Sequence, residues 1–297
     1  MTKQQFKGTA ALLLATVIWG FAFIAQSVGM DLIGPFTFQM VRCALAVVFL
    51  FTISPLLDLG KCSFAQSLAK WKDKQLWKAG TICGCALFAA ASLQQIGLVY
   101  TDAGKAGFIT AMYIVLVPVL GVFLKRRIPK NALFSVGLAV FGLYLLSCMG
   151  VGSINIGDIC LMGCALAFAV QINCIDALAG TLDGLRLNCI QSLVVSLLSI
   201  PFVIATETVD VGNLLNCWGP LCFAGVLSMG VAYTLQIVGQ KALEPTAAAL
   251  IMSLESVFAT LGGWWLLNET MTGPELLGCG MVFAAVVISQ LPTKKVG

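Results

Sequence analysis

Ten stretches of this sequence are nearly free of charge and long enough to cross a lipid bilayer. A helical crossing needs about 20 predominantly apolar residues. The stretches cover 7–29, 35–54, 75–99, 104–124, 131–148, 157–176, 185–205, 214–239, 245–267 and 274–291. In lipid only helices and closed barrels satisfy every backbone polar group, and these stretches are too long for barrel strands. The sequence therefore predicts an all-α polytopic membrane protein with ten transmembrane helices.

The composition narrows the chemistry that such a chain can perform. Hydrophobic residues make up 59% of the chain and charged residues 10%, whereas a soluble domain carries about 25% charged residues. The lipid bilayer is thus the expected surrounding, and nothing in the net charge of +4 indicates a nucleic-acid partner. Histidine, the commonest metal ligand and the usual catalytic base, is absent. We expect no metal, no cofactor and no catalytic residue.

The basic residues lie almost entirely on one side of these crossings. If the first crossing starts inside, every lysine and arginine except Arg42 and Lys105 falls in or beside an inner segment. Enrichment of inner segments in lysine and arginine sets the orientation of membrane proteins. We therefore predict that both termini are cytoplasmic and that the chain lies in the cell inner (cytoplasmic) membrane.

The second half of the sequence repeats part of the first. Residues 94–147 align without a gap with residues 236–289, and the identical pairs include Gln94/Gln236, Gly97/Gly239, Ala106/Ala248, Ile109/Ile251, Val115/Val257, Gly121/Gly263, Val140/Val282, Phe141/Phe283 and Ser147/Ser289. A second match, at a different offset, pairs Gly8 with Gly157. Each half contains five crossings, and an odd number forces the two copies into opposite orientations. The sequence predicts two inverted five-helix repeats, 1–150 and 151–297.

Two charged residues, Glu255 and Arg42, lie inside predicted crossings. A charge at the bilayer centre costs about 2.5–3.5 kcal/mol on insertion scales, so it needs a function or a partner. Glu255 lies about 15 Å into its crossing at the helical rise, and we expect it to couple a proton or to balance a cationic group. Arg42 cannot lose its charge. It is expected to form a gating or structural ion pair, with substrate contact as the alternative.

Neutral polar and aromatic side chains occur on several of the same crossings. The expected substrate-binding residues are Trp19, Gln94, Tyr113, Gln171, Tyr233 and Gln236. An apolar cavity with a few polar groups is typical of small-molecule sites. Each amide alone can also serve as a hydrogen-bonding contact between helices. Together they predict a shared cavity between the two halves.

Several short motifs follow one another along the chain. They are ATVIWG at 15–20, PFTFQMVR at 35–42, AGKAGFITAMY at 103–113, VP at 117–118, PTAAAL at 245–250, LESVFA at 254–259 and LNE at 267–269. In this order they resemble the EamA family of the drug/metabolite transporter superfamily. The resemblance implies two inverted five-helix repeats and secondary transport, often export of amino acids or other metabolites. The family often has proline after the residues matching Tyr113 and Glu255, where this chain has Ile114 and Ser256, so only Pro118 offers a cause for a helix bend.

These observations predict a secondary active transporter that exports a small metabolite such as an amino acid by alternating access. The sequence leaves proton coupling and the choice between monomer and homodimer open. ATP-driven transport is disfavoured because no GxxxxGK[ST] loop occurs. The alternatives are a passive small-solute channel and an intramembrane lipid-modifying enzyme. The enzyme would need a catalytic acid–base or metal cluster, so we do not expect one.

Overall fold

The computed structural model describes the chain except residues 1, 61, 102, 125–129, 148–154, 267–271 and 291–297. Within these limits every element is helical and none is a strand. The first half contains α1 (Lys3–Met30), α2 (Pro35–Leu57), α3 (Phe64–Ala69), η1 (Lys70–Lys72), α4 (Lys74–Tyr100), α5 (Ala103–Ala111), α6 (Tyr113–Phe123) and α7 (Lys130–Ser147). The second contains α8 (Ile156–Leu178), α9 (Gly184–Thr206), α10 (Val211–Asn216), α11 (Trp218–Cys222), η2 (Phe223–Ala232), α12 (Tyr233–Gln240), α13 (Pro245–Met252), α14 (Leu254–Leu266) and α15 (Gly273–Gln290).

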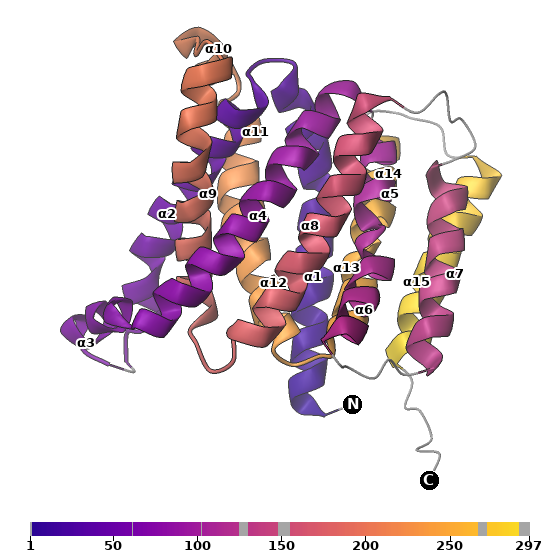
Figure 1. Cartoon of the computed structure of the whole chain (residues 1–297), viewed down its shortest axis with the longest axis horizontal. Coiled ribbons are helices and arrows are strands. Elements are labelled where there is room, and N and C mark those ends of the chain that lie inside the picture. Colours follow the sequence, from indigo (N-terminus) through magenta and orange to yellow (C-terminus); the bar gives the residue numbers. More distant parts are fainter. Residues whose placement is uncertain are drawn as a thin grey trace.

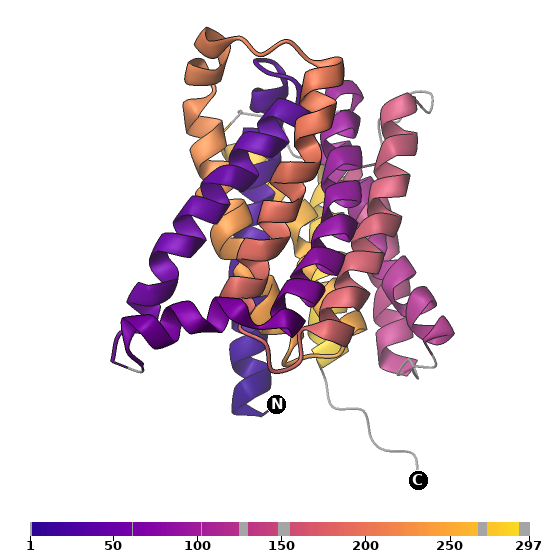
Figure 2. The same cartoon turned by 60° about the vertical axis from the view of Figure 1, so that its left-hand side comes forward.

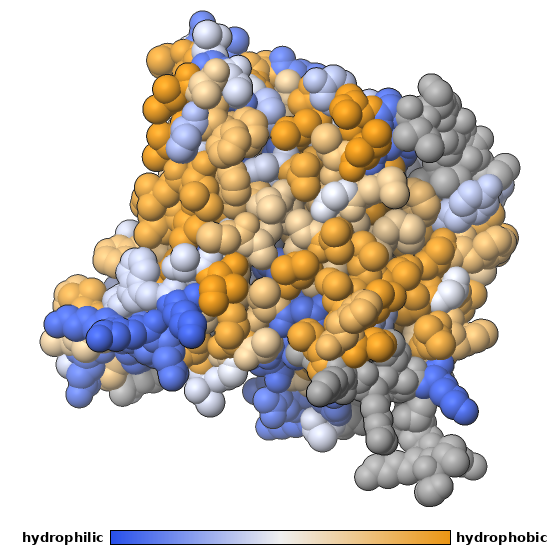
Figure 3. Space-filling model, viewed as in Figure 1, coloured by the Kyte–Doolittle hydropathy of each residue, from blue (hydrophilic) through white to orange (hydrophobic). Residues whose placement is uncertain are grey.

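The helices divide into long apolar stretches and a few short connectors. Eight stretches of the described residues are long and apolar enough to cross a membrane. Two further apolar helices, over 132–145 and 273–289, are shorter. Figure 3 shows one face of the molecule, in the view of Figure 1. Apolar residues cover a broad zone across the middle of this face, and hydrophilic residues gather toward the two ends of the helix bundle. The protein is therefore a multi-pass membrane protein whose apolar surface faces lipid.

Helix α1 runs through the middle of the bundle and contacts α12, η2, α13 and α14 (Figure 1). Helix α4 packs against α8 and α9, and α2 packs against α9. Helices α7 and α15 pair with each other at one edge of the bundle. Figures 1 and 2 both place α3 at the same end of the bundle as the start of α1. Buried polar residues of these packed helices include Gln26 on α1, Arg42 on α2, Gln95 on α4 and Gln171 on α8.

Two helix crossings in different halves are built from matching glycines. At the crossing of α1 with α12, a Cβ on Gly8 would lie 3.1 Å from the Gly239 carbonyl oxygen. At the crossing of α8 with α4, a Cβ on Gly157 would lie 2.9 Å from the Gly97 carbonyl oxygen. Small residues allow such close approach of helix backbones in membranes. Because Gly8 aligns with Gly157 and Gly97 with Gly239, the same contact is made twice in the molecule.

Two predicted crossings are broken near their middles rather than continuous. The first breaks at Met112, between α5 and α6, and the second at Ser253, between α13 and α14. Each break contains an i→i−3 hydrogen bond: the Met112 amide donates to Ile109 at 3.2 Å and the Ser256 amide to Ser253 at 3.2 Å. Such bonds tighten a helix locally into a 3₁₀ turn.

A side-chain hydrogen bond to the backbone accompanies the second break, where no proline follows Glu255. The Ser253 hydroxyl donates to the Leu250 carbonyl at 2.8 Å, and a serine that bonds back in this way often bends a helix. The first break lies six residues before Pro118, so that proline does not mark it. The two breaks come within one residue of equivalent positions in the repeat alignment.

The crossing over 218–240 is interrupted differently, by the π-helical segment η2. Its last turn includes a hydrogen bond from the Tyr233 amide to the Ser228 carbonyl, five residues back. This wider turn places Ser228 and Tyr233 one above the other along the helix. π-Helical turns are rare and occur frequently at functional sites.

Candidate functional site

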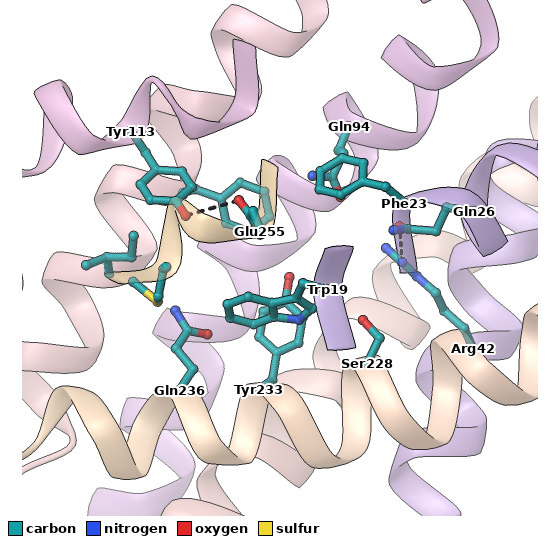
Figure 4. A pocket seen from close by; sticks show the side chains of 13 residues that line it. Trp19, Phe23, Gln26, Arg42, Gln94, Tyr113, Ser228, Tyr233, Gln236 and Glu255 are labelled. Atoms are coloured by element: carbon teal, nitrogen blue, oxygen red, sulfur yellow. Dashed lines mark hydrogen bonds between the residues drawn. The ribbon is translucent and has the colours of Figure 1, made fainter. Parts of the chain in front are cut away.

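A cavity lies inside the bundle, with about 450 Å³ of space between atoms, part of which is open to solvent. Its lining comes from α1, α2, α4, α6, α8, η2, α12, α13 and α14 (Figure 4). The lining residues are Trp19, Phe23, Gln26, Arg42, Gln94, Tyr113, Phe168, Ile172, Ser228, Tyr233, Gln236, Met252 and Glu255. The structure thus brings the predicted site residues together around one cavity, with Gln171 as the exception.

Tyr113 and Glu255 meet on one side of this cavity. The Tyr113 hydroxyl donates a hydrogen bond to Glu255 Oε1 at 3.0 Å. Tyr113 opens α6 and Glu255 is the second residue of α14, so each follows directly on a helix break. Glu255 is only 6% exposed. A buried carboxyl group with one neutral donor can exchange a proton or accept a cation.

Aromatic rings form much of the wall between the polar groups. The rings of Trp19 and Tyr233 lie 5.0 Å apart, edge to face. Phe168 lies edge to face against Tyr113 at 6.3 Å. Within the described part of the chain the Trp19 indole N–H has no hydrogen-bond partner. This wall offers apolar contact area together with a buried, unused N–H donor.

Arg42 lies on the other side of the cavity, where Figure 4 shows it beside Gln26. The Arg42 guanidinium donates to Gln26 Oε1. The same oxygen accepts from Gln95 Nε2 at 2.6 Å, and Gln26 Nε2 donates to the Ala22 carbonyl at 3.0 Å. Gln26 is therefore held in one orientation, with its oxygen turned toward Arg42.

The remaining amides take different positions. Gln94 and Gln236 both line the cavity. Gln171 lies behind that surface, and its Oε1 accepts a hydrogen bond from Gln236 Nε2 at 3.2 Å. Gln236 Oε1 and Gln171 Nε2 have no partner among the described residues. Gln171 therefore supports Gln236 from behind rather than lining the cavity.

Several lining residues were not among the sequence predictions: Phe23, Gln26, Phe168, Ile172, Ser228 and Met252. The sequence could have predicted Gln26 as a lining residue, because it lies seven residues after Trp19 and therefore on the same face of the helix. The sequence does not predict Ser228 as a lining residue. It lies on the same helix face as Tyr233 only because the turn between them is π-helical.

A second buried arginine lies away from the cavity, where the segment around α3 meets the start of α9. Arg186 donates to Asp58 at 2.6 Å, to Asp183 at 2.7 Å and to the Ser67 hydroxyl at 2.9 Å. Lys70 adds a hydrogen bond to Asp58 at 2.8 Å. The hydrogen bonds from Lys70 and Ser67 hold the pKa of Asp58 well below its usual value. This cluster ties α2 and α3 to α9.

Comparisons with known proteins agree with this architecture. The model of the EamA-like transporter family matches residues 6–148 and again residues 155–290. An uncharacterized transporter of Archaeoglobus fulgidus is 32% identical over 94% of this chain and 84% of its own length. The threonine/homoserine exporter RhtA of Escherichia coli (strain K12) is 30% identical over 59% of each chain. A crystal structure at 16% identity superposes with a TM-score of 0.78 over 95% of this chain and 96% of that one, which shows a shared fold.

Proposed function

Because the chain belongs to the EamA-like transporter family, we propose that it is a secondary active transporter that exports a small metabolite by alternating access. An amino acid is the proposed class of substrate. The observation that carries this proposal is the central cavity, where the buried Tyr113–Glu255 pair follows directly on two helix breaks. Broken helices around a central site are the usual construction of substrate and ion sites in secondary transporters.

The proposed mechanism needs two halves that move against each other, and these are residues 1–150 and 151–297. The twofold family match, the matching glycine crossings and the paired helix breaks support this division. Tyr113 and Glu255 occupy equivalent positions in the two halves and touch each other. Equivalent residues of a twofold arrangement meet only near its axis, so the cavity would lie where the halves rock.

The topology that we propose has ten transmembrane helices, counting α7 and α15, in two inverted repeats. The distribution of lysine and arginine supports cytoplasmic termini and, with them, a place in the inner membrane. In this orientation α3 and the Arg186 cluster would face the cytoplasm.

Each polar group of the cavity receives a role in the proposal. Glu255 couples a proton or binds the amino group of the substrate, with Tyr113 as its hydrogen-bond partner. Gln94, Tyr233 and Gln236 orient the substrate, and Trp19 supplies the apolar wall. Gln171 acts through Gln236, which it holds in place. The printed name of the RhtA relative supports threonine and homoserine as the first solutes to test.

The test is counterflow of labelled amino acids, threonine and homoserine first, in proteoliposomes. We expect saturable exchange that depends on pH in the wild type. In Glu255→Gln this pH dependence should be lost, because an amide cannot bind and release a proton. Gln171→Ala is the matched control: it also changes a buried polar side chain but leaves the carboxyl group in place, so pH dependence should persist.

Three results would contradict the proposal. Single-channel conductance without saturable exchange would support a passive channel. Turnover of labelled lipids without solute movement would support a lipid-modifying enzyme. Exchange with the same pH profile in Glu255→Gln as in the wild type would leave a carrier but remove the coupling role of Glu255.

A further inference from the structure

The cavity carries opposite charges on its two sides. Figure 4 shows Tyr113 and Glu255 on one side, and Arg42 with Gln26 and Ser228 on the other. Arg42 and Glu255 are the charged residues of the lining. Their formal charges sum to zero when the carboxyl group is ionised. The lining is therefore neutral as a whole but strongly polarised from one side to the other.

Arg42 is a buried cation for which the described residues supply no carboxylate partner. Its side chain is 2% exposed, and no carboxylate in the described ranges lies within salt-bridge distance of it. Arginine stays protonated in proteins, and a buried charge is costly unless it is paired and hydrogen-bonded. What Arg42 contacts instead is the neutral oxygen of Gln26, the side chain of the neighbouring Cys43 and the ring of Phe38 at 5.7 Å.

The donors of this guanidinium are only partly used. Arginine carries five N–H donors in a planar fork. One nitrogen donates to Gln26, while Nε is buried without a hydrogen-bond partner among the described residues. A carboxylate matches this fork and accepts two parallel hydrogen bonds from it. Arg42 lines the cavity and therefore brings to it a positive charge and a guanidinium whose donors are not all used.

We propose that Arg42 binds the carboxylate group of the transported solute, which is a zwitterion held with its amino group toward Glu255. This assignment rests on the proposed transport function and specifies the chemistry of its substrate. Ser228, on the same side of the cavity, supplies a hydroxyl donor for the second carboxylate oxygen. The hydrogen bond to Gln26 holds the Arg42 guanidinium in the orientation in which it would bind the carboxylate.

The composition of the lining separates a carboxylate from a larger anion. Phosphate sites gather several cationic or backbone donors, but among the described lining residues Arg42 is the one cation. A single positive charge balances a single carboxylate. The aromatic and aliphatic lining between the two charged sides, which includes Trp19 and Phe168, suits the uncharged remainder of an amino acid.

The first arm of the test uses the wild-type protein alone. The purified transporter is screened for thermal stabilisation by the twenty proteinogenic amino acids. Each one that stabilises is then compared with its carboxamide, its decarboxylated amine and its deaminated acid. A ligand raises the melting temperature according to its affinity for the folded state. We expect the carboxamide and the amine to bind at least about tenfold more weakly than the amino acid, which is the loss of one charged hydrogen-bond partner.

The second arm uses Arg42→Gln and Arg42→Lys. In Arg42→Gln we expect the preference for the amino acid over its carboxamide to disappear. In Arg42→Lys a smaller preference should remain, because the charge is kept but the fork is lost. The control is Lys105→Gln, which removes a positive charge that is paired with Asp158 outside the cavity. This control should keep the full preference.

The proposal is overturned if carboxamides or amines stabilise the wild type as well as the amino acids do, or if no carboxylate compound stabilises it. It is also overturned if Arg42→Gln keeps the wild-type preference. Counterflow of an amine or an uncharged solute in the same preparation would preserve the transport function while removing this subsite. Failure of all counterflow would instead remove the transport function itself.

Discussion

Two arginines of this protein are equally buried but differ in what surrounds them. Arg186 is 1% exposed and Arg42 is 2% exposed. Arg186 has two carboxylate partners, Asp58 and Asp183, and hydrogen bonds to Ser67. Arg42 has a single amide oxygen, from Gln26. Burial alone therefore does not say what an arginine does.

The different partners of Arg186 and Arg42 show how a buried charge that stabilises the fold can be distinguished from one that binds a ligand. A charge that holds helices together gains nothing from an unused donor, so its partners come from the protein, as at Arg186. A charge that awaits an anion must keep its donors on the cavity side, and this arrangement costs stability in exchange for function. The predictions below test that distinction, beginning with the largest effect.

Arg186→Met should unfold the protein more easily. The change leaves Asp58 and Asp183 without their shared cation. Removing one partner of a buried ion pair costs about 3–5 kcal/mol, and we expect about 3 kcal/mol because Asp183 is 38% exposed. The measurement is the midpoint of chemical or thermal unfolding in detergent. An unchanged midpoint would show that Arg186, like Arg42, is not needed to hold helices together.

Arg42→Met should show the reverse pattern. Transport should fall by about tenfold or more, the value of one charged hydrogen bond. The unfolding midpoint should stay the same or rise, because a buried charge without an anion is replaced by an apolar side chain. Gln26 keeps its 2.6 Å hydrogen bond from Gln95. Counterflow and thermal unfolding on the same preparation separate the two effects, and a large loss of stability would end the contrast with Arg186.

Tyr113→Phe should have an intermediate effect at the other side of the cavity. The change removes the hydroxyl that donates to Glu255 but keeps the ring against Phe168. A single hydrogen bond is worth about 1 kcal/mol, or roughly a fivefold loss of substrate affinity. Competition in the counterflow assay measures this change. Equal affinities would show that the Tyr113 hydroxyl serves packing alone.

The smallest effect is expected from acid on the Arg186 cluster. The folded-state pKa of Asp58 is held below its usual value, chiefly by the hydrogen bonds from Lys70 and Ser67. The stabilisation is therefore complete above the unfolded-state pKa, about 3.9, and is lost as the pH falls below it. Between pH 5 and pH 3 the wild-type melting temperature should drop by a few degrees more than that of Asp58→Asn. Parallel acid profiles of the two proteins would contradict this.

Much of the cavity could be predicted because polar residues in long apolar stretches must face the protein interior. That reasoning led to Glu255, Tyr113 and Gln94, which the structure places on one cavity. Their roles in binding stay predictions. Gln171 faces inward too, yet it lies behind Gln236, because an inward direction does not reveal the depth of a side chain.

Two features depend on backbone geometry that the residue pattern does not show. The break before Glu255 contains the hydrogen bond from Ser253 to Leu250, and the same kind of bond from Thr16 to Leu13 leaves α1 unbroken, so the residue type alone does not predict a break. The place of Ser228 depends on the π-helical turn, which departs from the helical period used to assign helix faces. Helix existence was predictable from apolar length, whereas these local departures were not.

The π-helical segment has a consequence for how this transporter can change over generations. Ser228 and Tyr233 are five residues apart and share a face because the turn between them is π-helical. Removal of one residue between them would leave them four residues apart, a spacing that an α-helix also places on one face. A one-residue deletion at this point can therefore replace the π-helical turn by an α-helical one and keep the Ser228–Tyr233 face, whereas a deletion in a purely α-helical crossing turns everything beyond it by about 100°.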